Sequence, residues 1–349
     1  MKTSPTPAFL SDSAPACASG SRLDGEHPTD CTQHALPDVL IDSAHPGESL
    51  LTRVGVIKAK HDYSVRRADT ANEMRGMKQS PKREELYREI RDCVEKEALL
   101  EGRLKTKFIP QHGLTQFLSP RAFFQSSLFN AQSRSVTRRP NIELELLSID
   151  GRPALNYSGP ELRQSDGRVF LALLHMLRDV QVGTRVLLQP EQMCVALFGR
   201  YDGNSRKQLL SHIQRLQKGL MLTDTFSVQL CQEFDYPKRG PWRVALHPHI
   251  VQLFLVSPKV WLSMPMRLSL PEGLPTWLYA YIESQTYLIP MRVSTIQTLS
   301  GSVAGERAFN NSLRLALRVL SSNGILESGW SLRHGKVHWL KKLPPKRQA

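Results

Sequence analysis

Apolar side chains recur along this chain with strand and helix periods, and one order of these periods occurs twice. The first copy spans residues 186–220 and the second spans residues 291–325. Each copy has a short strand-like run, a short apolar segment, a turn and a long helix pattern rich in basic residues. An apolar, β-prone run that turns back through a basic tip follows each copy. This order is typical of a winged helix-turn-helix, so the chain is predicted to contain two of them in tandem.

The long helix predicted in the first copy, residues 204–220, has one narrow apolar stripe. Its apolar positions are Leu209, Ile213, Leu216 and Leu220, at steps of four, three and four residues. The polar residues on or beside the opposite face are Asn204, Lys207, Ser211, Gln214, Arg215 and Lys218. Amides and basic groups reach base edges, and Lys and Arg neutralise phosphates, so these residues are candidate DNA contacts. An ordinary solvated surface helix would have the same pattern.

The segments around this helix favour DNA binding. Residues 190–198 form a short helix pattern with proline at its start, as expected for the first helix of a helix-turn-helix. Residues 226–230 and 242–246 alternate like two strands, and residues 236–241 join them. Packing against a core does not explain Lys238 and Arg239 at the tip of this hairpin. We therefore expect the tip to be a DNA-contacting wing.

The second copy has a more strongly basic face. Its long helix is expected to bury Phe309, Leu313, Ala316, Leu317 and Leu320 and to turn Arg307, Asn311, Arg314 and Arg318 outward. Arginine pairs bidentately with guanine and asparagine with adenine, so this face is the better candidate for base reading. A hairpin follows, turning at His334–Gly335, with Arg333 and Lys336 at its tip.

The rest of the chain sets the predicted domain boundaries. Residues 1–80 are polar, with two aromatic residues, and are predicted to be disordered. Residues 81–140 are predicted to be a charged linker helix (82–104), either solvated or a docking helix, followed by a loop. Packed structure is expected from Asn141, with a first winged-helix domain over 141–265, a second over 266–342 and a basic tail over 343–349. The predicted fold class is α+β.

Composition narrows the class of partner. The 349 residues have a formal net charge of +14, which makes a nucleic acid the default partner. The five cysteines are scattered, with no C-x-x-C pair, which argues against a zinc finger and suits a reducing cytosol. The chain has no signal-peptide pattern, no membrane-spanning apolar run and no P-loop. We expect a cytoplasmic protein without cofactor or metal that is not an enzyme.

Four segments carry a resemblance to a known family. They are Ser127–Phe129, Asn156–Arg163, Gly167–Asp179 and Leu209–Gly219, in an order that matches over about residues 120–340. With the two helix-turn-helix patterns and the terminal hairpin, the chain resembles the TrfA-type plasmid replication initiators. The resemblance implies a bacterial protein that binds repeated origin sequences (iterons) as a monomer and is held inactive as a dimer. It also implies opening of an AT-rich region and the host initiator DnaA and replicative helicase as partners.

A short peptide motif adds a further partner. Residues 125–129, Gln-Ser-Ser-Leu-Phe, resemble the Gln-x-x-Leu-Phe peptide that docks on the bacterial DNA-polymerase sliding clamp. In that mode Leu128 and Phe129 would enter an apolar pocket while Gln125 makes polar contacts. The resemblance places this motif in the linker before the first domain.

Two other functions remain open from the sequence. A transcriptional repressor, or an initiator that also represses its own promoter, would share every DNA-binding feature. A rolling-circle nickase would need metal ligands and a tyrosine nucleophile, for which His247 and His249, with Tyr279, Tyr281 or Tyr287, are the available residues. Pro248 between the two histidines disfavours a central strand, so the nickase is the weaker alternative.

Overall fold

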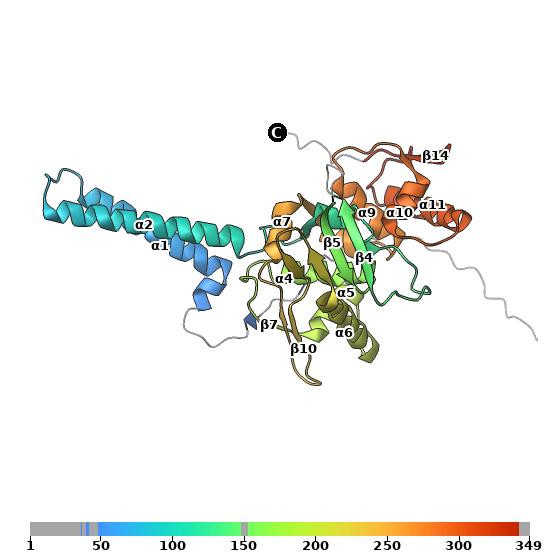
Figure 1. Ribbon diagram of the computed structural model, residues 1–349, viewed down its shortest axis with the longest axis horizontal. Coiled ribbons are helices and arrows are strands. Elements are labelled where there is room, and N and C mark those ends of the chain that lie inside the picture. Colours follow the sequence, from blue (N-terminus) through green and yellow to red (C-terminus); the bar gives the residue numbers. More distant parts are fainter. Residues whose placement is uncertain (1–35, 37–39, 42–47, 148–152, 342–349) are drawn as a thin grey trace, which may run out of the picture. The chain divides into compact units, whose positions relative to one another are not determined.

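The fold is α+β, with helices and short strands interleaved along the chain (Figure 1). The computed structural model describes residues 36, 40–41, 48–147 and 153–341. The predicted basic tail 343–349 and the first 35 residues of the predicted disordered region lie outside them. No helix among the described residues is long and apolar enough to cross a membrane.

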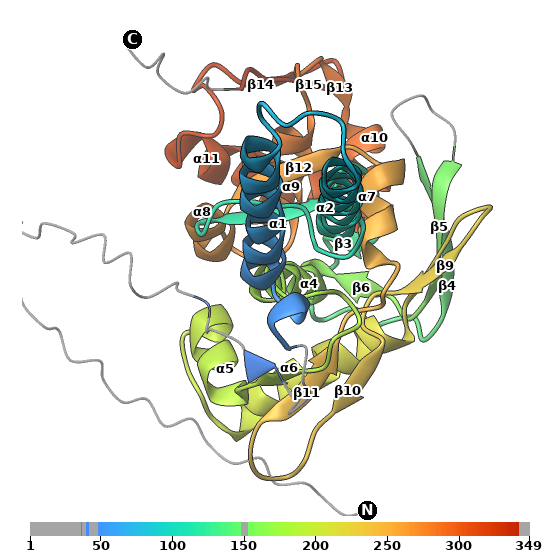
Figure 2. The same cartoon turned by 90° about the vertical axis from the view of Figure 1, so that its left-hand side faces the viewer.

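Two long antiparallel helices lie near the start of the described chain. They are α1 (Arg53–Glu73) and α2 (Pro81–Thr106), which lie side by side in both views (Figure 1 and Figure 2). Thr52 and Ser80 cap them by accepting hydrogen bonds from backbone N–H groups of their first turns. The seam between them has a seven-residue spacing on each helix: Val56, Tyr63 and Thr70 on α1, and Leu86, Cys93 and Leu100 on α2. This spacing is that of a two-helix coiled coil.

The predicted linker helix is confirmed as α2, but the prediction of disorder up to residue 80 is wrong for residues 53–73. Those residues form α1. The first 80 residues are polar on average, but α1 has one apolar stripe. This stripe is enough to pack against one partner helix, α2. Ion pairs across the hairpin join Lys60 to Glu101, Arg66 to Glu89 and Arg67 to Glu97.

Packed structure begins before Asn141, contrary to the sequence prediction. Strand β2 (Gln116–Pro120) pairs antiparallel with β12 (Lys259–Ser263), and β3 (Phe129–Asn130) pairs parallel with β6 (Leu162–Arg163). Between β2 and β3 lies the short helix α3 (Arg121–Phe124). Most side chains of this region are buried. Its strand partners lie far away in the sequence, so local periodicity could not reveal them.

The first DNA-binding candidate unit follows the predicted order. Helix α4 (Gln164–Met176) leads to β7 (Val186–Leu188), α5 (Pro190–Phe198) and α6 (Gly203–Lys218). A hairpin of β10 (Glu233–Asp235) and β11 (Trp242–Ala245) comes next. In the sheet, β11 lies between β7 and β10, and β1 (Leu40–Ile41) pairs with the free edge of β7.

The second unit repeats this order. Helix α9 (Leu274–Ser284) leads to β13 (Met291–Arg292), α10 (Val293–Ser300) and α11 (Glu306–Ser322), and the hairpin is β14 (Ser331–Arg333) with β15 (Lys336–His338). The last strand, β15, again lies between the first and the middle strand. The two units therefore share both the order of elements and the strand pairing.

A second four-stranded sheet corrects one predicted strand. Its order is β4 (Ile142–Leu147), β5 (Pro153–Gly159), β8 (Leu220–Leu222) and β9 (Ser227–Gln229). The first wing was predicted to use residues 226–230, but β9 pairs with β8, where Val228 lies opposite Met221. Residues 227–229 do form a strand, as their alternation predicted, but this strand belongs to the sheet of β4, β5 and β8 instead of the wing. The wing strand is β10.

Short elements connect these parts. They are the 3₁₀ turns Glu48–Leu51 and Ile250–Gln252, α7 (Leu253–Val256) and α8 (Met264–Ser269). Arg267 of α8 is 2% exposed and donates to the backbone and side-chain oxygens of Gln164 at the start of α4. Burial lowers the pKa of Arg267 to about 9. This buried contact ties the segment before the second unit to the first unit.

Candidate nucleic-acid interface

Helix α11 presents the polar face that its sequence predicts. Arg307, Asn311, Arg314 and Arg318 are all exposed, whereas the apolar stripe from Phe309 to Leu320 is at most 1% exposed. The four outward residues are four, three and four positions apart, which keeps them on one side of the helix. The face therefore offers three guanidinium groups and one amide to a partner.

Helix α6 presents a more mixed face. Asn204, Lys207 and Lys218 are exposed, and Ser211 and Gln214 are half-buried. Asp202 caps the helix by accepting hydrogen bonds from the N–H groups of Asn204 (2.9 Å) and Ser205 (2.6 Å). Gly199, with φ of 71°, ends α5 and lets the chain turn into α6.

Arg215 does not belong to that outward face. Its Nε donates to the carboxylate of Asp166 at 2.8 Å, and its side chain is 22% exposed. Its assignment as a free DNA contact is therefore corrected: the guanidinium is held by a buried carboxylate. The sequence placed Arg215 beside the outward face of the helix, but its side chain points toward the buried Asp166.

Both hairpin tips carry exposed basic residues. Lys238 and Arg239 lie in the turn between β10 and β11, and Arg333 pairs with Lys336 across the second hairpin. His334 and Gly335 make that turn with φ of 49° and 68°. Two central residues with positive φ match the twist of a tight hairpin.

Sequence reasoning missed Arg206, which joins α6 to the first hairpin. Its Nη2 donates to the carbonyl oxygens of Pro237 (3.0 Å) and Lys238 (3.1 Å), and its guanidinium lies 5.2 Å from the ring centroid of Trp242. The contact fixes the basic tip relative to the helix. The hairpin tip lies about thirty residues beyond Arg206 in the sequence, so no local pattern signals this role.

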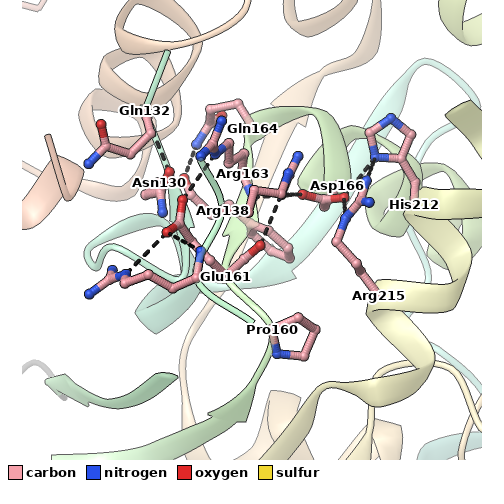
Figure 3. A network of polar contacts seen from close by, with 12 residues as sticks. Asn130, Gln132, Arg138, Pro160, Glu161, Arg163, Gln164, Asp166, His212 and Arg215 are labelled. Carbon is pink, nitrogen blue, oxygen red and sulfur yellow. Dashed lines mark hydrogen bonds and ion pairs between the residues drawn. The ribbon is translucent and has the colours of Figure 1, made fainter. Parts of the chain in front are cut away.

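A buried polar network lies behind α6 (Figure 3). Its centre is Asp166, whose side chain is 0% exposed. The carboxylate accepts from Arg138 Nη1 (2.7 Å), His212 Nδ1 (2.7 Å) and Arg215 Nε (2.8 Å), and from the backbone N–H of Arg163 (2.8 Å). Since Nδ1 of His212 donates to the carboxylate, the nearby Arg215 Nη2 cannot also use it as an acceptor.

The electrostatic balance of this site favours the charged carboxylate. Burial alone would raise the pKa of Asp166, but the hydrogen bond from His212 and the charges of Arg215 and Arg138 hold it well below its ordinary value. The network therefore links three parts of the chain, the segment before β4, the start of α4 and the middle of α6, through one charged group.

A second carboxylate extends the network toward residues 133–139. Glu161 accepts from Nε of Arg163 (3.0 Å) and Nε of Arg139 (3.1 Å). Arg163 also donates to the carbonyl oxygens of Ser133 and Val136, both at 2.7 Å. The polar loop that the sequence left unassigned is thus held against α4 by charged groups.

The clamp-like peptide is not available as an extended ligand. Leu128 is 0% exposed and Phe129 is 3% exposed, and both belong to the main apolar core. The carbonyl oxygen of Ser126 accepts from Nε1 of Trp277 at 3.0 Å, and the carbonyl oxygen of Phe129 accepts from the side chain of Gln164. In this folded state the predicted insertion of Leu128 and Phe129 into a clamp pocket is wrong. Gln125 is half-buried.

The three tyrosines considered as nickase nucleophiles differ in exposure. Tyr279 and Tyr281 are buried, and burial raises the pKa of both hydroxyls, whereas Tyr287 is exposed. The rings of His247 and His249 are 5.5 Å apart. The described part of the chain has no group of three His, Cys, Asp or Glu side chains that could hold a metal ion.

Comparisons with known proteins find similarity among solved structures. No protein-family model matches the chain, and no curated protein matches it. Among solved structures, the chain is similar to the crystal structure of a selenomethionine derivative of domain 2 and domain 3 of RctB. The identity is 14% and the TM-score 0.43, and the similarity covers 64% of this chain and 99% of that chain. The resemblance to the TrfA-type family stays a prediction.

Proposed function

We propose that this chain is a non-enzymatic replication initiator that binds repeated duplex DNA sites through two tandem winged helices. In each unit the second helix of the helix-turn-helix enters a major groove, and the hairpin that follows contacts the backbone. Helix α11 reads bases, and α6 combines DNA contact with positioning of the first unit.

The observation that carries the proposal is the repeated arrangement of elements. Both units have the order helix, strand, helix, helix, hairpin, with the last strand between the other two. In both, the long helix and the hairpin tip expose basic groups. A fold that repeats the same basic surface twice in a chain of charge +14 suits a partner with repeated phosphates.

The direct test of base reading is the Arg314→Ala variant on duplex fragments of the replicon that encodes this protein. We expect a loss of about 1–3 kcal/mol on the specific site, with little change on unrelated duplex, because a guanidinium that reads a base adds to specific binding alone. Arg88→Ala, an exposed arginine on α2, is the matched control and leaves both affinities unchanged. Equal losses on specific and unrelated DNA would contradict base reading by α11.

Replication itself separates an initiator from a repressor. A plasmid that carries only the origin is expected to replicate in a cell that supplies this chain and no other plasmid initiator. DNA binding together with promoter repression, but without plasmid maintenance, would favour the repressor. Self-association as an inactive dimer, with DnaA and the replicative helicase as partners, belongs to the same proposal.

A further inference from the structure

A cleft of about 380 Å³ lies beside α6, between this helix and the segment 133–139. Five basic side chains line it: Arg134, Arg138, Arg163, Lys207 and Arg215. The acidic side chain in its lining is that of Glu272, and Ser165, Asn204, Gln208 and Ser211 add neutral polar groups. The lining therefore has five basic groups and one acidic group in a partly enclosed space, and Asp166 and Glu161 behind it compensate part of the positive charge.

The buried carboxylates behind the cleft hold its arginines in place. Arg138 and Arg215 both donate to Asp166, and their side chains are 27% and 22% exposed. A guanidinium has five N–H donors, and these ion pairs use only part of them. Arg138 Nη1 also donates to the carbonyl oxygen of Glu161, and both arginines line the cleft at positions set by a fully buried carboxylate. Their unused N–H groups are the candidate donors to a bound anion. Such fixed guanidinium groups bind a tetrahedral anion with little loss of side-chain entropy.

The rim of the cleft is closed by an ion pair. Nη2 of Arg134 lies 2.5 Å from Oε2 of Glu272, and the side chain of Arg134 is 80% exposed. Glu272 is also 3.7 Å from Arg168, and its side chain is 19% exposed. The carboxylate of Glu272 thus neutralises the guanidinium of Arg134 within the protein. A backbone phosphate, which also carries one negative charge, would compete with Glu272 for the same guanidinium.

We propose that this cleft binds a backbone phosphate of duplex DNA, with Arg134 and Lys207 as ligands and Arg138 and Arg215 as fixed donors behind them. Glu272 then acts as an internal competitor that weakens binding. The inference rests on the proposed function, because Lys207 and Asn204 place the cleft on the outward side of α6. It makes the segment 133–139 a part of the DNA interface.

The test uses two variants of the full chain with opposite expected effects. Arg134→Ala removes a phosphate ligand, so we expect roughly tenfold weaker binding of any duplex at about 0.1 M salt. The slope of log affinity against log salt should also fall by about one. Glu272→Gln removes the competitor and keeps the size of the side chain, so we expect tighter binding. Both variants must retain the wild-type circular dichroism spectrum.

Matched controls come from an ion pair on the helical hairpin. Arg66 and Glu89 form a 2.6 Å pair with an exposed arginine, like that of Arg134 and Glu272. Arg66→Ala and Glu89→Gln are expected to leave DNA affinity and its salt slope unchanged. Parallel changes in these controls would show a general effect of net charge and would overturn the assignment of the cleft.

The outcomes separate this inference from the proposed function. If Arg134→Ala and Glu272→Gln both weaken binding, the pair is structural and the inference is wrong. If neither changes binding while Arg314→Ala lowers specific affinity, the inference alone fails. If the wild-type chain shows no salt-dependent binding to duplex DNA, both fail.

A further experiment distinguishes a site for a DNA phosphate from a site for free inorganic phosphate. Inorganic phosphate is compared with chloride at equal ionic strength by thermal unfolding. A rise in the unfolding midpoint that Arg134→Ala abolishes, together with unchanged DNA binding by that variant, would identify a site for free phosphate and overturn the DNA assignment.

Discussion

Single buried charges determine how this chain holds its candidate interface together. Asp166 lies under α6 and receives three charged or polar side chains from the segment before β4 and from α6 itself. Removing one member of a buried charged group leaves the others without compensation. The same residue therefore governs both stability and the position of the helix.

The Asp166→Asn variant measures this role. We expect unfolding free energy to fall by about 3–5 kcal/mol, because Arg138 and Arg215 lose their buried counter-ion. Denaturant unfolding followed by circular dichroism gives the value. Asp92→Asn, which breaks the exposed pair with Lys96, should cost less than about 1 kcal/mol. A similarly small cost for Asp166→Asn would contradict the network as a stabilising element.

Acid should destabilise the fold in two separate pH ranges. Burial and the charge of Arg178 lower the pKa of His175 to about 4, with His112 and Asp179 also facing it. The unfolded chain then takes up this proton first, so stability falls as pH decreases from about 6.5 to about 4. The pKa of Asp166 is depressed, so its contribution is present above the unfolded-state value of about 4 and is lost below it.

His175→Asn tests the first range, because an amide nitrogen can replace Nδ1 as the donor to the carbonyl oxygen of Gln116. Unfolding free energy measured between pH 7 and pH 4 should fall less steeply in this variant than in the wild type. An unchanged slope would exclude His175 as a source of acid sensitivity. Asp166→Asn should leave this range unchanged and flatten the decrease below about pH 4.

Leu128 offers a test of the corrected clamp motif. The side chain is fully buried in the core, so Leu128→Ala should lower unfolding free energy by about 2–5 kcal/mol. Chemical denaturation measures this loss, and Leu114→Ala, at a position 74% exposed, is the matched control. A stability equal to that of the wild type would mean that the segment is not held in the core.

The first hairpin is expected to contact the DNA backbone. Lys238→Ala with Arg239→Ala should weaken specific and unrelated duplex alike and lower the salt slope by about two, since each lost phosphate contact lowers it by about 0.9. Fluorescence titrations over a range of salt concentrations measure both effects. Thr223→Ala with Thr225→Ala, in the loop between β8 and β9, is a control outside the proposed interface. A specific loss alone would indicate base contact by the tip.

Elements with local signals could be predicted, and elements with distant partners could not. Helix α5 has the predicted bounds because Pro190 favours its start and Gly199 favours its end. Strand β2 was missed because its partner β12 lies far away in the sequence. Asp166 was missed because one aspartate in an apolar helix has no local signature. Leu128 and Phe129 were misread because an apolar pair suits a core as well as a partner's pocket.

The molecule joins two similar basic units in one chain. Each exposes a long polar helix face and a basic hairpin tip, and one continuous apolar core includes residues of both units. Two DNA-binding surfaces on one core suit repeated sites better than one isolated site. Several phosphate contacts also make affinity fall steeply with salt.

Footprinting on the DNA beside the gene shows whether the chain binds repeated origin sites. We expect a ladder of protected segments that repeats at one or two helical turns, about 10 or 20 base pairs. The ladder should weaken in Arg314→Ala and remain in Arg88→Ala. A single protected palindrome, or no protection at salt concentrations where the chain still binds unrelated duplex, would contradict an initiator that binds repeated origin sites.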